Sequence, residues 1–110
     1  MDVMQEHLDA FNARNLDRFM AVYAADAVHE DGVGDIRMQG YDAIRAAYRD
    51  LFTRNPALHA RIAHHIRVGA SVIAEEYITG RNGEGGPAER YGVGIYRIVD
   101  DKLVHVRWLE

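Results

Sequence analysis

The sequence predicts an α+β domain in which three helices come first and long antiparallel strands follow. Two observations lead to this prediction. Apolar residues recur with a helical period up to Phe52, and from Leu58 onward they alternate with polar ones, as in a strand. No internal repeat, linker or low-complexity segment divides the 110 residues. We therefore expect a single domain, residues 1–110, with its helices packed in a strongly curved, mainly antiparallel sheet.

The three expected helices each have a recognisable beginning or end. The first follows Asp2, whose carboxylate can accept an early helical N–H. The second follows Asn15, another residue type that caps helices, and the third ends at Asn55-Pro56 because proline cannot continue a helix. Their apolar faces are formed by Met4, Leu8 and Phe11, by Leu16, Phe19, Met20 and Tyr23, and by Tyr41, Ile44, Tyr48, Leu51 and Phe52.

A short strand over residues 27–31 is expected between the second and third helices, followed by a glycine-broken loop. Long strands are expected over residues 58–68, 71–79, 90–99 and 102–109. In the first of these, one face is apolar except for His64. The strand over 71–79 is mixed on both faces, so alternation alone does not show which side of it is buried.

Composition excludes several classes of function. The net charge of −4, from 13 basic and 17 acidic residues, argues against a nucleic-acid partner. The absence of cysteine excludes disulfides and thiolate metal sites. No apolar run approaches the ~18 residues of a membrane span, and the acidic, amphipathic start is not a signal peptide, so we expect a cytoplasmic protein with no membrane partner.

Asp31, at the end of the first predicted strand, is the leading candidate for a proton-handling group. A carboxylate facing an apolar cavity between helices could act as a general base. Alternatively, Asp31-Gly32 is a turn pair whose carboxylate bonds loop amides. His29 lies two residues earlier, so it points to the same side and could share the proton of Asp31, or it could be a half-buried histidine bonded to the backbone. His64 resembles a polar group in a pocket, although a hydrogen-bonded core histidine explains it equally well.

Three segments carry a resemblance to a known superfamily: NLDRFMAVYAADAVHED, GYDAIRAAYRDLF and IYRIVDDKLVHVRW. In this order they resemble the nuclear transport factor 2-like superfamily, which includes SnoaL-type polyketide cyclases, ketosteroid isomerases, scytalone dehydratase and limonene epoxide hydrolase, besides many non-enzymes. The resemblance runs from Glu6 to Trp108 and implies a cystatin-like cone. It is specific for the fold and much less so for activity, because this fold hosts many functions.

The resemblance also implies positions for site residues. It gives the role of catalytic base to Asp31 and turns Glu75 into the cavity, although the competing register of that strand turns Glu75 to solvent. Ketosteroid isomerases have a tyrosine and a protonated aspartate as oxyanion donors where this chain has His7 and Gly94. Glycine has no side chain to donate, so we expect poor ketosteroid isomerisation at best. The ligand contacts implied or expected are His7, Tyr48, Glu75, Tyr77, Tyr96 and Trp108.

These observations predict a small-molecule enzyme that acts on an apolar or cyclic carbonyl compound by isomerisation, cyclisation or dehydration. Asp31 would be the base, with His64 and His29 assisting. No cofactor is expected, and no metal either, because the spacing of the acidic residues and histidines is not a ligand motif. The alternative is a non-catalytic ligand-binding or dimerisation module of the same fold. We also expect a homodimer through the outer sheet face, where Val93 and Ile95 point outward.

Overall fold

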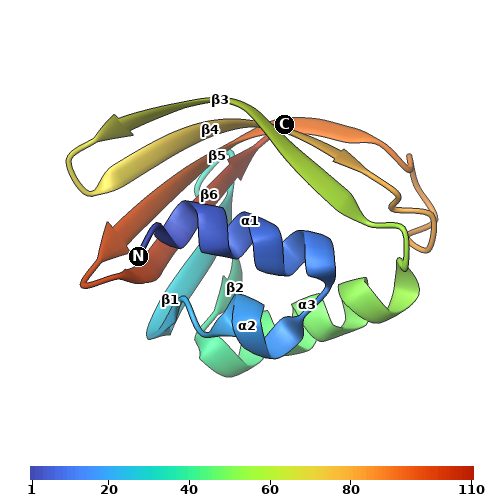
Figure 1. The fold of residues 1–110 in the computed structure, drawn as a ribbon, viewed down its shortest axis with the longest axis horizontal. Coiled ribbons are helices and arrows are strands. Elements are labelled where there is room, and N and C mark those ends of the chain that lie inside the picture. Colours follow the sequence, from blue (N-terminus) through green and yellow to red (C-terminus); the bar gives the residue numbers. More distant parts are fainter.

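The computed structural model describes residues 1–110, with three helices on one face of a six-stranded sheet (Figure 1). The α+β prediction is confirmed. The helices are α1 (Val3–Ala13), α2 (Leu16–Met20) and α3 (Tyr41–Arg54). The strands are β1 (Tyr23–Asp31), β2 (Ile36–Gln39), β3 (His59–Val68), β4 (Ser71–Thr79), β5 (Arg90–Val99) and β6 (Lys102–Leu109).

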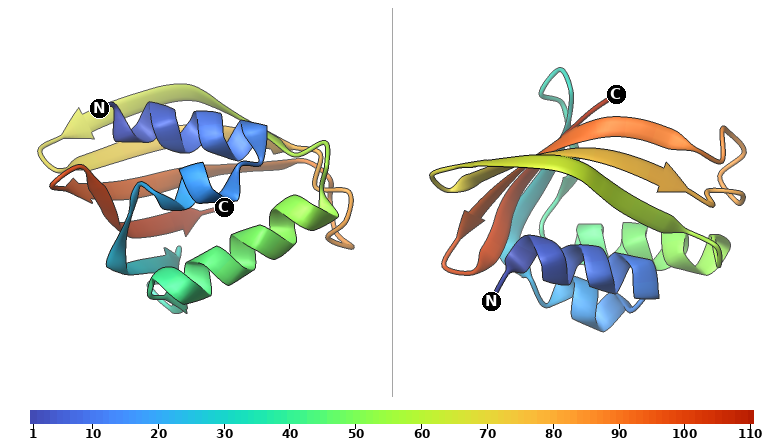
Figure 2. Two further views of the ribbon diagram at one scale, coloured as in Figure 1. Left: turned by 60° about the horizontal axis from the view of Figure 1, so that its bottom comes forward. Right: turned by 45° about the horizontal axis from the view of Figure 1, so that its top comes forward.

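The sheet has the strand order β2-β1-β6-β5-β4-β3. All neighbouring strands are antiparallel except β1 and β6, which run parallel. The sheet curves over the helices, and its opposite face carries no helix (Figure 2). The mainly antiparallel, curved sheet is as predicted. None of the helices is both long and apolar enough to cross a membrane.

The helix starts are as predicted, but the segment after α2 differs. The carboxylate of Asp2 accepts the backbone N–H of Gln5 at 3.1 Å, and Asn15 caps α2 in the same way. The second helix ends at Met20, so Tyr23 opens β1 instead of belonging to a helix face. Strand β1 is therefore longer than expected. Strand β2, predicted as loop, forms by pairing with β1, and its four residues are too few to show a period.

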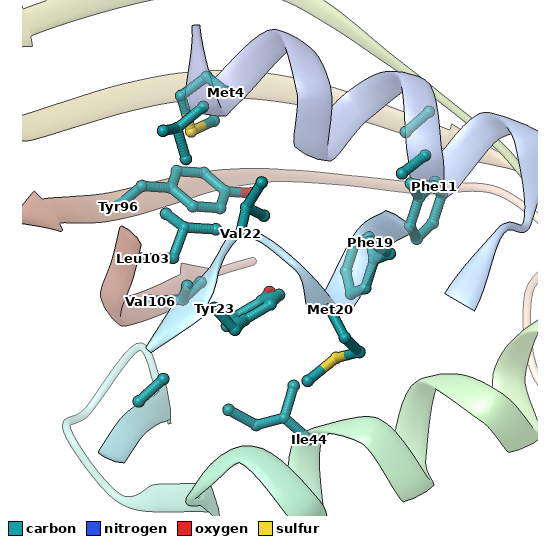
Figure 3. Packing of buried hydrophobic residues seen from close by; sticks show 14 of the residues in the cluster. Met4, Phe11, Phe19, Met20, Val22, Tyr23, Ile44, Tyr96, Leu103 and Val106 are labelled. Carbon is teal, nitrogen blue, oxygen red and sulfur yellow. The ribbon is translucent and has the colours of Figure 1, made fainter. Parts of the chain in front are cut away.

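The core lies between the helices and the inner sheet face, where 18 buried hydrophobic residues form one cluster. Figure 3 shows 14 of them. Phe19 joins three elements within it. Its ring centroid lies 4.6 Å from that of Tyr48 on α3 and 5.4 Å from that of Tyr23 on β1. This packing holds the helices against one part of the sheet and leaves a cavity over the rest.

Candidate active site

A cavity of about 660 Å³ opens between α1, α3 and the inner sheet face. Of its 24 lining residues, 14 are hydrophobic, so it suits an apolar small molecule. The wall also carries polar side chains from several elements. They include His7, His29, Asp31, Tyr48, Glu76 and Tyr96.

Glu76 on β4 is the buried carboxyl group of this cavity, with only 7% of its surface exposed. One of its oxygens, Oε2, accepts a hydrogen bond from the hydroxyl of Tyr96 on β5. Burial raises the pKa of Glu76 to about 7, and the bond from Tyr96 opposes this only in part. The carboxyl group can therefore take up or release a proton near neutral pH.

Two glycines on β5 make room for this arrangement. A Cβ atom at Gly94 would collide with the Tyr96 ring and lie 2.7 Å from Oε2 of Glu76. A Cβ atom at Gly92 would collide with the Trp108 indole. Both glycines face inward on the same strand, so their small size is what allows Glu76 and Trp108 to occupy the wall.

Two histidines of the wall are joined by a tyrosine behind them. The Tyr23 hydroxyl lies 2.9 Å from Nε2 of His7 and 3.1 Å from Nε2 of His29. Burial, and to a lesser degree the nearby His29, lowers the pKa of His7 to about 3. Burial, followed by the effect of His105, lowers the pKa of His29 to about 4. Both imidazoles are thus neutral at physiological pH.

Asp31 lies at the rim of the cavity, with its carboxylate bonded to the loop that follows. Its Oδ1 accepts the backbone N–H groups of Val33 and Asp35, each at 3.0 Å. Its Oδ2 lies 4.0 Å from Nη1 of Arg37. These contacts are those of the turn alternative considered from the sequence. Both loop amides bond Oδ1, so the turn holds this carboxylate in place and leaves Oδ2 without a hydrogen bond.

The sequence model of the SnoaL-like domain family matches residues 4–106. This chain belongs to the SnoaL-like domain family. No curated protein matches the sequence.

Solved structures similar to this SnoaL-like domain share its fold across nearly the whole chain. An uncharacterized cystatin fold protein from Novosphingobium aromaticivorans is 26% identical, with a TM-score of 0.88 over 99% of this chain and 96% of that one. A protein with a ketosteroid isomerase-like fold from Catenulispora acidiphila, in complex with trimethylamine, is 18% identical, with a TM-score of 0.78 over 97% and 83%. An LEH-like epoxide hydrolase from Mycobacterium tuberculosis is 18% identical, with a TM-score of 0.78 over 97% and 78%.

Within this SnoaL-like domain, strand β4 has the register opposite to the one expected from the resemblance. Val72, Ala74 and Glu76 face inward, whereas Glu75 and Tyr77 face outward. The expected placement of Glu75 and Tyr77 in the cavity is therefore wrong. The physical reason is the pairing with β5, which puts Glu76 opposite Gly92 and beside Gly94, where missing side chains leave room for its carboxyl group, while Glu75 has two hydrogen-bond donors on the outer face.

The expected placement of His64 in the cavity is also wrong. The pairing of β3 with β4 shifts between Ile62 and His64, where one extra residue is inserted. Such a bulge moves every following side chain to the other face, which strict alternation does not anticipate. His64 is consequently 86% exposed, and its Nδ1 lies 2.8 Å from Oε1 of Glu75 on the outer face.

The other expected contacts line the cavity, namely His7, His29, Tyr48, Tyr96 and Trp108. Sequence reasoning missed Glu76 and Tyr23. The inward pair Gly92 and Gly94 was the available signal for Glu76, because two glycines two residues apart on one strand face mark space filled by neighbouring side chains. No three His, Cys, Asp or Glu side chains are placed to hold a metal ion together.

Proposed function

We propose that this SnoaL-like domain is a small-molecule enzyme that moves protons on an apolar or cyclic carbonyl compound without a cofactor. Its central group is Glu76 instead of Asp31. The observation that carries the proposal is a buried carboxyl group with a pKa of about 7 on the wall of a mostly apolar cavity. A general base is most effective when its pKa lies near the working pH.

The surroundings of Glu76 support this role. Tyr96 bonds only one carboxylate oxygen, and no buried side-chain oxygen or nitrogen lacks a partner, so the other oxygen is accessible from the cavity. Removal of a proton next to a carbonyl group leaves negative charge on the carbonyl oxygen. The imidazoles of His7 and His29 and the Tyr48 hydroxyl line the same cavity, so a ring N–H and a hydroxyl are available as donors for that charge.

In ketosteroid isomerases and in this protein, the carboxyl group of the cavity would come from different strands. The resemblance places their aspartate, a neutral carboxylic acid that donates a hydrogen bond, at the position of Gly94. Here the space that a side chain at Gly94 would take is filled by the Glu76 carboxylate from the neighbouring strand. The carboxyl group thus reaches this region from another strand, which implies a substrate other than a steroid.

The test is deuterium exchange at the carbon next to a carbonyl. Wild-type protein is incubated with cyclohexanone or β-tetralone in deuterium oxide, and the label is followed by NMR. We expect exchange above background that falls by about 100-fold or more in Glu76→Gln. The matched control is Glu75→Gln on the outer face, which should keep the wild-type rate.

Two results would contradict the proposal: no exchange of either ketone by the wild type, or exchange that survives in Glu76→Gln. The alternative, a binding module without turnover, requires no proton acceptor. It would show ligand affinity that is equal in wild type and Glu76→Gln, with no exchange in either.

We also propose that two copies associate through the outer sheet face. Ile66, Ile73, Tyr77 and Tyr91 are exposed there although they are large and apolar. Ile95 pairs with Ile73 on the neighbouring strand, so these side chains form one continuous patch. Sedimentation should show a dimer at micromolar concentration that Ile73→Asp separates, and a wild-type monomer would refute the proposal.

A further inference from the structure

Hydrogen bonds link the side chains of His7, Tyr23 and His29 in a row, and this row connects two points of the cavity wall through the protein interior. His7 on α1 and His29 on β1 line the cavity, whereas Tyr23 does not and is only 3% exposed. The Tyr23 hydroxyl is within hydrogen-bonding distance of Nε2 of both rings, at 2.9 and 3.1 Å.

Hydrogen-bond chemistry limits which of these three side chains can donate and which can accept. A hydroxyl group has one proton and two lone pairs, so Tyr23 can donate to one ring while it accepts from the other. Both rings are neutral, and burial holds the pKa of Tyr23 well above its usual range, so the hydroxyl keeps its proton. The ring that donates to Tyr23 carries its proton on Nε2, and the ring that accepts carries its proton on Nδ1. In this arrangement the two imidazoles are opposite tautomers.

The Nδ1 atoms are the free ends of this chain. Neither Nδ1 of His7 nor that of His29 bonds a protein group, and no buried side-chain nitrogen is left without a partner. Both Nδ1 atoms are consequently accessible, and both rings belong to the cavity wall. One end presents a lone pair and the other an N–H, so the wall holds an acceptor and a donor that are linked to each other.

We propose that His7, Tyr23 and His29 form a neutral proton relay that takes a proton from one oxygen of a bound ligand and delivers one to a second oxygen. The ligand class that uses both ends and Glu76 together is an α-hydroxy ketone. This substrate class rests on the proposed function, because it requires Glu76 as the base for the carbon-bound proton.

The reaction balances with the ligand and these side chains alone. The Glu76 carboxylate takes the proton of the carbon that bears the hydroxyl group, and the electrons of that C–H bond leave an enediolate with its charge on the former carbonyl oxygen. One Nδ1 then takes the hydroxyl proton while the other Nδ1 gives its proton to the charged oxygen. Each hydrogen bond at Tyr23 passes one proton. Glu76 finally returns its proton to the former carbonyl carbon, and the other oxygen becomes the carbonyl.

The net result is that the hydroxyl and carbonyl positions exchange, with no oxidant or reductant required. The relay carries no net charge at any stage, which suits rings that are too buried to become imidazolium. Each transfer reverses both tautomers. His7 and His29 then return to their original tautomers by proton exchange with water before the next turnover in the same direction.

The relay itself is tested on the wild-type protein without a ligand. Long-range proton–nitrogen correlation spectra of the imidazoles distinguish a proton on Nδ1 from one on Nε2. We expect opposite tautomers for His7 and His29 at neutral pH. The same tautomer in both rings, or an imidazolium in either, would overturn the relay.

The substrate class is tested with phenylacetylcarbinol, whose isomer is an aryl ketone with a distinct ultraviolet absorption. Wild-type protein should convert one into the other. Tyr23→Phe should lower the ratio of this isomerisation to the deuterium exchange of β-tetralone by about 100-fold, because only isomerisation uses the relay. The matched control Tyr91→Phe, on the outer face, should leave the ratio unchanged.

The outcomes separate this inference from the proposed function. Exchange of β-tetralone without isomerisation of phenylacetylcarbinol by the wild type overturns the α-hydroxy ketone class. An unchanged ratio in Tyr23→Phe overturns the relay. If the wild type exchanges no ketone, the proposed function and the substrate class fail, and the imidazole tautomers still decide whether the relay exists.

Discussion

Each face of the sheet carries a glutamate and a histidine, and the two faces treat them in opposite ways. On the outer face, Glu75 accepts bonds from His64 and Tyr91, and these bonds lower its pKa. On the inner face, burial raises the pKa of Glu76 to about 7 and lowers that of His29 to about 4. Glu75 and Glu76 are neighbours in the sequence, so the alternation of side chains along the strand alone separates a hydrogen-bonded surface carboxylate from a proton-handling one.

The largest expected effect concerns the inner histidines. The unfolded chain binds their protons below the ordinary pKa of 6.5, whereas the folded protein does not until about 3 for His7 and about 4 for His29. Their stabilising contribution is therefore lost as pH falls from about 6.5. In Glu76→Gln, the free energy of unfolding should drop by about 4 kcal/mol between pH 7 and pH 5, or about 2 per histidine. Urea titrations at both pH values measure this, and a flat stability would contradict buried neutral histidines.

The next effect isolates Glu76. Its folded pKa of about 7 exceeds the ordinary value of 4.5, so its contribution is present below pH 4.5 and is lost as pH rises through 7. The stability of Glu76→Gln relative to wild type should therefore increase by about 3 kcal/mol between pH 4.5 and pH 7.5. Glu75→Gln, measured in the same series, should not become more stable relative to wild type as pH rises. A pH-independent difference between Glu76→Gln and wild type would show that this carboxyl group is not desolvated.

A smaller effect comes from the glycine that makes room for the inner carboxyl group. Gly94→Ala should destabilise the protein by about 1–3 kcal/mol, because the new Cβ atom meets the Tyr96 ring and the Glu76 carboxylate. Gly86→Ala is the control, since a Cβ atom there has open space. Thermal unfolding of both variants measures the difference. Equal melting temperatures would mean that Tyr96 and Glu76 can move aside and are not tightly packed around Gly94.

Sequence reasoning succeeded where a pattern was long and had a single explanation. The helix after Asp2 and the strands after Leu58 followed from period and capping, and the cavity positions of Tyr96 and Trp108 followed from the family resemblance. These features depend on local chemistry or on the fold as a whole. The fold class and most of the cavity wall could therefore be predicted.

The side chains placed on the wrong sheet face have one cause: a shift of one residue exchanges the inward and outward faces of a strand. Strand β4 has apolar residues on both faces, so its pattern allowed either Glu75 or Glu76 inside. In β3, a single inserted residue turned His64 outward, and no residue type marks such a bulge in advance. The candidate site was misassigned at these positions because pairing with neighbouring strands, and not local sequence, determines which face a residue takes.

The most direct test of this account is a titration of the two neighbouring carboxyl groups followed by carboxyl carbon NMR. The inner position of Glu76 predicts a pKa near 7, and the His64 and Tyr91 bonds predict a pKa for Glu75 below its ordinary value of 4.5. Assignments come from Glu75→Gln and Glu76→Gln, each of which removes one signal. A pKa of Glu76 at or below 4.5 would contradict the account, because a carboxyl group that is fully ionised well below neutral pH is neither desolvated nor suited to exchange protons with a substrate near pH 7.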